Sequence, residues 1–401
     1  MIAFITSRVR FLPKPGSITS TLTAKFPRCY LGLATLLALF GYIYVLMFPL
    51  LILTGIITIY ESIVFREAVD WQTVITWTVI IIVAILVCYR SLQIKPALPV
   101  GLTVTDNKAP ELFSLVQQLL SQYKRPKIHR IIITGNYELD IIRTPRFALP
   151  LWPSNTLVIG LPVMQSLSPR QFECRLAGRI GQHSGQHNLL TNWLYQLRQI
   201  WPQYKLVYNR QKGFGTEPMK WFFAIYSPLY KTASTQVARQ EELNADTYAM
   251  QHYNDEEVRE MITADSLCRW YLRNQYWPSV CKVASTDTKT LPTPHIKMAA
   301  AVYTSMSGEK LQSLMAKAIR HIPSSRDTAP SLQSRIENIG HDKARLGRPA
   351  TKTAAAHYLG GSMNGVISII DKLWQKTYLQ KRKQQHRQKQ KQAGSKQAAN
   401  A

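Results

Sequence analysis

Two long stretches without a charged residue dominate the hydropathy pattern near the start of the chain. The first covers residues 30–60 and the second covers residues 71–89. A helix needs roughly 20 residues to cross a hydrocarbon core of about 30 Å, so each stretch can cross once. Tilt, or a kink at Pro49, can absorb the surplus length of the first stretch. The pattern predicts a two-helix transmembrane hairpin within residues 29–92.

The charges around these stretches predict the orientation of the hairpin. The outer flanks are basic, whereas the connecting loop holds one arginine against three acids (Lys25, Arg28, Arg90 and Lys95 in the flanks; Arg66, Glu61, Glu67 and Asp70 in the loop). Because basic flanks stay on the cytoplasmic side, both termini and the main domain are predicted to be cytoplasmic. The five cysteines include no CxxC pair, which is typical of free thiols in a reducing compartment.

Beyond the hairpin, residues 93–378 alternate between helical and strand periodicity. Residues 109–123 carry apolar side chains on one helical face, and short apolar runs at 128–134 and 155–160 predict strands. Further helical patterns cover residues 241–253, 265–277, 313–322, 332–339 and 365–378. The predicted fold class is mainly α with a small β-sheet (α+β). The apolar run 219–230 is short and contains Pro228, which favours a core or interfacial segment over a third span.

The helix predicted for residues 168–188 is the segment around which the domain is organised. Ser168 at the N-cap, Pro169 at the first helical position and Gln171 at the third form the pattern of a capping box. One helical face then carries Phe172, Leu176, Ile180, His183 and His187. Three glycines, each costing up to about 1 kcal/mol relative to alanine in a helix, predict that another element packs closely on this helix (Gly178, Gly181 and Gly185).

The net charge of +26 is concentrated at the two ends of the chain. Residues 1–28 form a predicted basic cytoplasmic N-terminus, and residues 379–401 form a Lys/Gln-rich tail that predicts disorder. Basic ends beside a membrane favour contact with anionic lipid, and nucleic acid is not the expected partner. The sequence contains no GxxxxGK[ST], GxGxxG or GxSxG motif, which disfavours phosphate-loop, dinucleotide-binding and serine-hydrolase chemistry.

Several sequence pieces occur in one order that is known from a family of enzymes. After the hairpin come GLPVMQSLSPRQFECRLA, then SPLYKTASTQVARQEELNADTYA, then DTAPSLQSRI, and finally AAAHYLGG followed by DKLW. Together they resemble the HtpX-like and CAAX-prenyl-endopeptidase family of membrane zinc metallopeptidases. The resemblance covers residues 93–378 besides the hairpin, and it implies a zincin-like metallopeptidase domain.

The resemblance also implies where the zinc chemistry of the family would lie. In that family, two histidines of an HExxH helix and a later glutamate hold zinc, and the glutamate of HExxH is the general base. In this chain the first ligand position is Gly178, the base position is Arg179 and the second ligand position is Gln182. Neither a glycine nor a permanent cation can take these roles. The aligned HExxH motif is therefore degenerate.

The later motifs match the family only in part. Glu242 occupies the third-ligand position and Asp246 the acidic position beside it, whereas Ala329 replaces a later histidine. A buried carboxylate without a metal needs another cation, because an unpaired buried charge is costly. We therefore predict that Arg179 replaces the cation and forms an ion pair with Glu242 or Asp246.

Three functional hypotheses follow. The first is a pseudopeptidase without zinc that binds a protein or peptide partner. The second is an active zinc metalloendopeptidase with a shifted site of His183, His187 and Glu242, although the shift rotates the ligands by about 100° and leaves no carboxylate between the histidines. The third is a non-enzymatic scaffold that binds anionic lipid or nucleic acid through the basic ends.

Overall fold

The computed structural model describes most of the chain, namely residues 27–65, 69–92, 98–123, 128–144, 154–184, 189–210, 215–286, 291–324, 327–347 and 352–399. Its helices are α2 (Pro27–Val64), α3 (Trp71–Leu92), α4 (Pro110–Gln122), α5 (Leu161–Ser166), α6 (Pro169–Ser184), α7 (Leu189–Arg210), α8 (Glu217–Ala233), α9 (Thr235–Ala249), α10 (Asp255–Tyr271), α11 (Trp277–Thr286), α12 (Pro294–Ser305), α13 (Gly308–Arg320), α14 (Leu332–Asn338), α15 (Ala354–Tyr358) and α16 (Met363–Ala399). Its strands are β1 (Gly101–Val104), β2 (Arg130–Thr134), β3 (Leu139–Thr144) and β4 (Ser154–Gly160).

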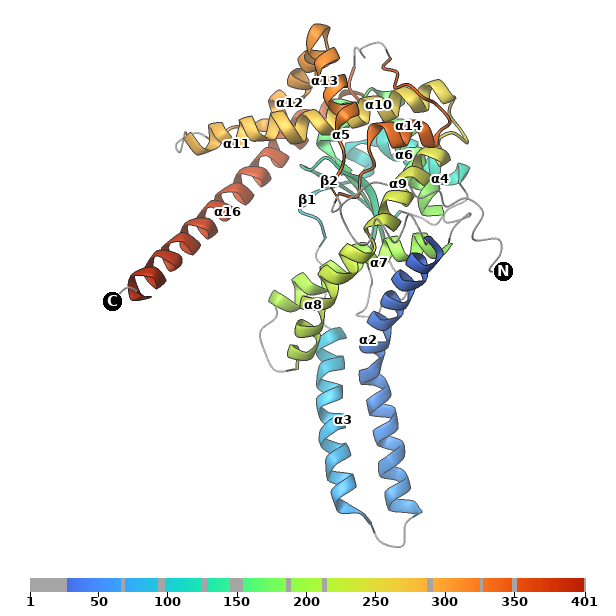
Figure 1. Cartoon of the computed structure of the whole chain (residues 1–401), viewed down its shortest axis with the longest axis vertical. Coiled ribbons are helices and arrows are strands. Elements are labelled where there is room, and N and C mark those ends of the chain that lie inside the picture. Colours follow the sequence, from blue (N-terminus) through green and yellow to red (C-terminus); the bar gives the residue numbers. More distant parts are fainter. Residues whose placement is uncertain are drawn as a thin grey trace.

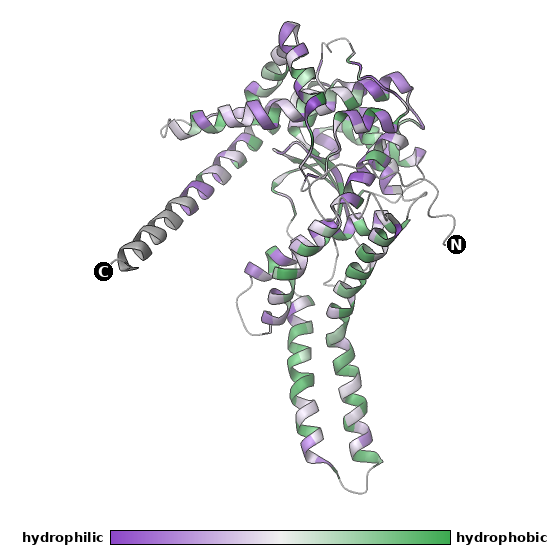
Figure 2. Ribbon diagram, in the orientation of Figure 1, coloured by the Kyte–Doolittle hydropathy of each residue, from purple (hydrophilic) through white to green (hydrophobic). Residues whose placement is uncertain are grey.

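Helices α2 and α3 form a hairpin that projects from the folded domain (Figure 1). Both are long enough and apolar enough to cross a bilayer, and only 17% and 11% of their most apolar windows are buried inside the protein. Figure 2 shows that hydrophobic residues predominate along both helices. Gly55 lets them approach, because a Cβ there would lie 2.9 Å from atoms of Trp77 and Ile81. The two predicted apolar helices are confirmed.

The four-stranded sheet is mixed, with the order β1-β2-β4-β3. Strands β2 and β4 are parallel, and the two edge strands are antiparallel to their neighbours. The sequence predicted only the two central strands. Both edge strands were missed: β1 has only four residues, and β3 interrupts its apolar positions with Asp140 and Arg143. Helices α4 and α6 share one hydrophobic core with this sheet, which fixes the position of α6.

Helix α6 begins as predicted. The Ser168 hydroxyl accepts a hydrogen bond from the Gln171 backbone N–H at 3.1 Å, and the Gln171 side chain accepts one from the Ser168 N–H at 3.1 Å. This reciprocal pair is a capping box. The buried apolar face follows the predicted spacing, with Phe172, Leu176 and Ile180 in the core. The helix is described to Ser184, so Gly185 and His187 lie outside the described residues.

An aromatic cluster joins the hairpin to the domain. Trp201 of α7 and Phe223 and Tyr226 of α8 are buried against the first half of α2. The Tyr226 hydroxyl donates a hydrogen bond to the Leu37 carbonyl at 2.9 Å. The hairpin is therefore packed against α7 and α8 and is not a loosely tethered anchor.

Helix α16 differs from the prediction at its end. It continues from Met363 to Ala399 and projects away from the domain (Figure 1), whereas residues 379–401 were predicted to be disordered. The lysine, arginine, glutamine and alanine residues of this segment are good helix formers, which accounts for the helix although no large apolar residue follows Leu379. Contact between this basic segment and anionic lipid stays a prediction.

Candidate functional site

The site is built where α6 crosses α9. A Cβ at Gly178 would overlap the carbonyl oxygen of Ala245, and one at Gly181 would lie 2.8 Å from the Cβ of Tyr248. A side chain at either position would push the two helices apart. The predicted close packing is confirmed for these two glycines. It also means that the first ligand position of the family motif lies against the backbone of α9 and has no room for histidine.

The Arg179 guanidinium forms an ion pair with the Glu242 carboxylate. The Arg179 side chain is 6% exposed and the Glu242 side chain 13% exposed, so most of both charges is withdrawn from water. The guanidinium also donates a hydrogen bond to Gln182 at 2.9 Å. The predicted ion pair is thus present, with Glu242 and not Asp246 as its acid.

Gln182, at the second ligand position, is held by neighbouring side chains. Its amide donates a hydrogen bond to the Glu241 carboxylate at 3.3 Å, and Thr191 donates a second bond to the same carboxylate at 2.5 Å. Burial raises the pKa of Glu241, and the bond from Thr191 opposes this effect. The Gln182 amide is therefore part of a hydrogen-bond network inside the protein.

Asp246 belongs to a neighbouring network centred on Arg335 of α14. Arg335 donates bonds of 2.8 and 2.7 Å to the two oxygens of Asp246, and a further bond of 2.8 Å to Asp265 of α10. Asp265 also pairs with Arg175 of α6. Because all four side chains are buried, these pairs tie α6, α9, α10 and α14 together at the site.

The charge state of Glu242 reflects its partner. Burial acts to raise the pKa of this carboxyl, but the guanidiniums of Arg179, Arg269 and Arg175 together outweigh burial and lower the pKa to about 2. For Arg179, burial acts to lower the pKa, and Glu242, Tyr195 and Asp140 together more than offset burial, so the pKa is raised. Both groups are therefore charged at neutral pH, and each provides the counter-charge that the other needs.

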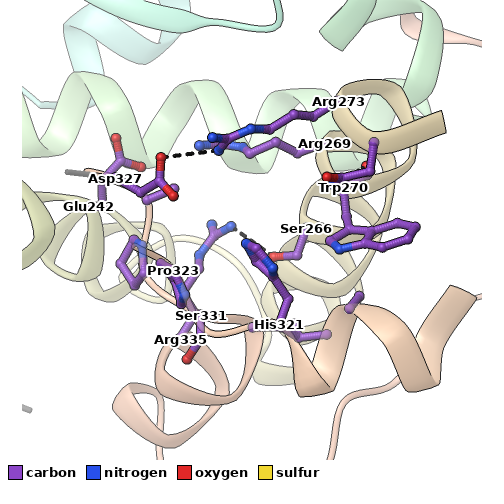
Figure 3. A pocket seen from close by; sticks show the side chains of 15 residues that line it. Glu242, Ser266, Arg269, Trp270, Arg273, His321, Pro323, Asp327, Ser331 and Arg335 are labelled. Carbon is purple, nitrogen blue, oxygen red and sulfur yellow. Dashed lines mark hydrogen bonds and ion pairs between the residues drawn. The ribbon is translucent and has the colours of Figure 1, made fainter. Parts of the chain in front are cut away.

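A small cleft opens beside this pair. Its cavity measures about 60 Å³, and its lining includes Glu242, Arg269, Trp270, Arg273, Ala329 and Arg335. Figure 3 shows Arg269 and Arg273 extending into the cleft from one wall and Arg335 approaching from the opposite side. Glu242 and Ala329, the residues assigned to the third-ligand and later histidine positions, line the same cleft.

Among the side chains that line the cleft, three arginines stand beside two acids (Arg269, Arg273 and Arg335; Glu242 and Asp327). Five guanidiniums pair with four carboxylates (Arg175, Arg179, Arg269, Arg273 and Arg335 with Glu242, Asp246, Asp265 and Asp327). The carboxylate of Asp265 is shared by three guanidiniums, and Arg269 lies farthest from it at 3.6 Å. Burial lowers the pKa of Arg269, and the positive charges of Arg335 and Arg179 lower it further, while Glu242 acts in the opposite direction. Of the three guanidiniums that share Asp265, Arg269 is thus the most weakly paired.

The residues at the family positions do not fit a zinc ion. Gly178 and Ala329 have no donor atom, Gln182 is bonded to Glu241, and Arg179 places a positive charge beside Glu242. A metal at Glu242 would lie next to that guanidinium and be repelled by it.

The shifted site is described only in part. His183 accepts a hydrogen bond from the Nε of Arg143 at 3.2 Å, and His187 lies outside the described residues. Within the described part of the chain, no group of three or more His, Cys, Asp and Glu side chains could hold a metal ion. The shifted site of His183, His187 and Glu242 thus stays a prediction.

Sequence reasoning missed most of the charged network. Arg175, Asp265 and Arg269 were treated as ordinary helix residues, and Arg335 only as part of a motif. The sequence does contain a sign of this network. Arg175 and Arg179 are one turn apart on α6, and Asp265 and Arg269 are one turn apart on α10. Charges repeated on otherwise buried helices indicate pairing across the interior. Apart from the Asp265–Arg269 pair within α10, the pairings could not be read from the sequence because each joins two different helices.

Comparisons with protein-family models, with curated proteins and with solved structures find no match for this chain. The resemblance to the HtpX-like family therefore stays a prediction that depends on the order and spacing of short motifs.

Proposed function

We propose that this chain is a membrane-anchored relative of zinc metallopeptidases that has lost metal-dependent hydrolysis and acts by binding a peptide or protein partner. The observation that carries the proposal is the Arg179–Glu242 ion pair, which stands where the family would hold its metal and its general base. An arginine in this pair is permanently protonated, so it cannot take a proton from water. The carboxylate it neutralises is the only matching zinc-ligand position in the aligned motifs.

The membrane anchor in this proposal is the hairpin of α2 and α3. Each helix crosses the bilayer once, and the basic flanks hold both termini and the zincin-like domain on the cytoplasmic side. The support is the length and exposure of the two apolar helices, together with the excess of basic residues at their outer ends. The cleft at Glu242 then faces the cytoplasm.

The cleft suggests the chemistry of the partner. Arg269 has a poorly placed carboxylate at 3.6 Å, and its Nε is buried without a hydrogen-bond partner. A carboxylate on a partner that reaches the exposed part of this guanidinium would supply the missing negative charge, and bonds between guanidinium and carboxylate are among the stronger ones in proteins. Trp270 beside Arg269 offers an aromatic surface for the neighbouring part of a peptide. We therefore expect an acidic peptide segment as the ligand.

Selection from a random dodecapeptide phage library on the full chain in nanodiscs tests this expectation. Wild-type protein should enrich peptides rich in Asp and Glu, and Arg269→Met should raise the Kd of the best peptide about 10-fold or more, equivalent to about 1.4 kcal/mol. Arg170→Met is the matched control, because Arg170 is 59% exposed and pairs on the surface with Glu173 and Glu257. A selection without acidic enrichment, or a lead peptide that binds both variants equally, would contradict the proposal.

A further inference from the structure

Helix α8 presents an apolar stripe that the folded domain leaves uncovered. Trp221, Ile225 and Leu229 are 69%, 70% and 54% exposed, and their spacing of four residues places them on one face of the helix. No charged residue occurs between Lys220 and Lys231. A stripe of this kind on a protein surface marks contact with another apolar phase or with a partner.

The opposite face of α8 is fixed to the protein. Phe223, Tyr226 and Tyr230 are buried in the aromatic cluster with α7. The hydroxyl of Tyr44 in α2 donates a hydrogen bond of 3.0 Å to the Pro218 carbonyl, and its ring stacks on Phe222 at 3.8 Å. The helix therefore cannot turn its exposed stripe inward without breaking this cluster.

Helix α8 lies next to the end of the hairpin that meets the domain (Figure 1). Gly215, just before α8, has its Cα so close to Leu86 of α3 that a Cβ would lie 2.7 Å from that side chain. The Tyr208 hydroxyl of α7 donates a hydrogen bond of 2.9 Å to Ser91 of α3. Both contacts hold α7 and α8 against the last turns of α3, where that helix leaves the hydrocarbon region proposed above.

The apolar surface of the hairpin continues onto α8. Helix α2 has 38 residues, so it is about 57 Å long at 1.5 Å per residue and exceeds a core of about 30 Å. Its first half packs against α8 and still exposes uncharged side chains, among them Leu36, Phe40 and Ile43. Phe40 contacts Phe222, with ring centroids 6.0 Å apart, and Phe222 lies three residues before Ile225, which makes the two neighbours on the surface of α8. One continuous apolar surface thus runs from the lipid-facing side of α2 to the stripe of α8.

We propose that α8 is an interfacial helix, with Trp221, Ile225 and Leu229 inserted among the lipids of the leaflet that faces the domain. Continuity with the hairpin surface favours lipid over a second copy of the chain, because the same bilayer that surrounds α2 and α3 reaches this stripe. Tryptophan is a frequent residue at the boundary between headgroups and acyl chains. Lys220 and Lys231, at the two ends of the stripe, are placed to meet anionic headgroups. The inference rests on the membrane anchor of the proposed function and adds a third element to it.

Thiol labelling tests the insertion. Full chains carrying Ile225→Cys are reconstituted at one copy per nanodisc of phosphatidylcholine and phosphatidylglycerol, so that no second copy can cover the stripe. A membrane-impermeant maleimide is added, and labelling of each cysteine is followed by peptide mass spectrometry. Native Cys281 on α11 is exposed and serves as the internal reference. The thiol at position 225 should react about 10-fold more slowly than Cys281, or slower still.

A second variant distinguishes a failure of the interfacial placement of α8 from a failure of the membrane anchor. Leu53→Cys lies in the middle of α2, where the side chain is 55% exposed in the protein alone. If position 53 is protected and position 225 labels as fast as Cys281, the interfacial placement of α8 is wrong, whereas the hairpin is still supported as the membrane anchor. If both positions label as fast as Cys281, the membrane anchor itself is wrong. Protection at both positions, with full labelling after denaturation, supports the inference.

Discussion

Replacing Arg179 by methionine should lower the free energy of unfolding of the full chain by about 3–5 kcal/mol, because it leaves the Glu242 carboxylate buried without its partner. Methionine keeps most of the side-chain volume, so the loss measures the charge and not a cavity. Urea unfolding of detergent-solubilised protein, followed by near-UV circular dichroism, gives the change in midpoint at constant slope. A change of less than about 1 kcal/mol, the range of exposed surface pairs, would contradict a buried pair.

Two further variants isolate the pair. In Arg179→Met with Glu242→Leu both charges are gone, and most of the stability should return, since apolar replacement of a buried pair is often neutral. Arg170→Met should change stability by less than about 1 kcal/mol, because that arginine is on the surface.

Acid supplies an independent check on the same pair. The pKa of Glu242 is lowered to about 2 from an ordinary value of 4.5. The ionised carboxylate therefore contributes fully to the free energy of unfolding above about pH 4.5, and this contribution is lost as the pH falls towards 2. The loss is on the order of 3 kcal/mol, and Glu242→Gln should abolish it. Equal acid sensitivity in wild type and Glu242→Gln would show that the loss of stability in acid does not come from Glu242.

Gly178→Ala should destabilise the chain by about 1–3 kcal/mol, although alanine is the better helix former by up to about 1 kcal/mol. The added methyl group meets the backbone oxygen of Ala245, which cannot rotate away as a side chain can. The two helices must therefore separate and loosen the core around them. The same unfolding assay measures the effect.

Gly365→Ala in α16 is the matched control, because a Cβ there would meet nothing within 4 Å. This change should be neutral or stabilising by up to about 1 kcal/mol. If Gly178→Ala behaves like Gly365→Ala, the close crossing of α6 and α9 is wrong. The crossing also explains why the degenerate motif cannot be reversed by one substitution, since a histidine at position 178 needs more room than alanine.

The sequence predicted the parts of the fold that have strong local signals. The capping box at Ser168, the apolar face of α6 and the two long apolar helices follow from residue types at fixed spacings. The edge strands β1 and β3 were missed because short strands obtain their stability from pairing with neighbours and not from their own residues.

The candidate site was predictable only where a resemblance supplied its positions. It placed Arg179 and Glu242 in one site, and the requirement to neutralise a buried carboxylate then led to their ion pair. The cleft was not predictable, because Arg269 and Arg335 come from helices with no motif that links them. Nor did sequence reasoning find that Arg335 is the partner of Asp246, since that choice depends on how α14 packs against α9.

The most direct test of the central claim is the zinc content of the full chain, purified in detergent after exposure to zinc and buffer exchange, together with its cleavage of unfolded casein. A functional zinc site of this family holds about one metal per chain. We expect zinc at background level, no cleavage above buffer, and no change in either on His183→Ala or Glu242→Gln. Stoichiometric zinc with cleavage, both lost in His183→Ala and Glu242→Gln, would contradict the account and establish the shifted site.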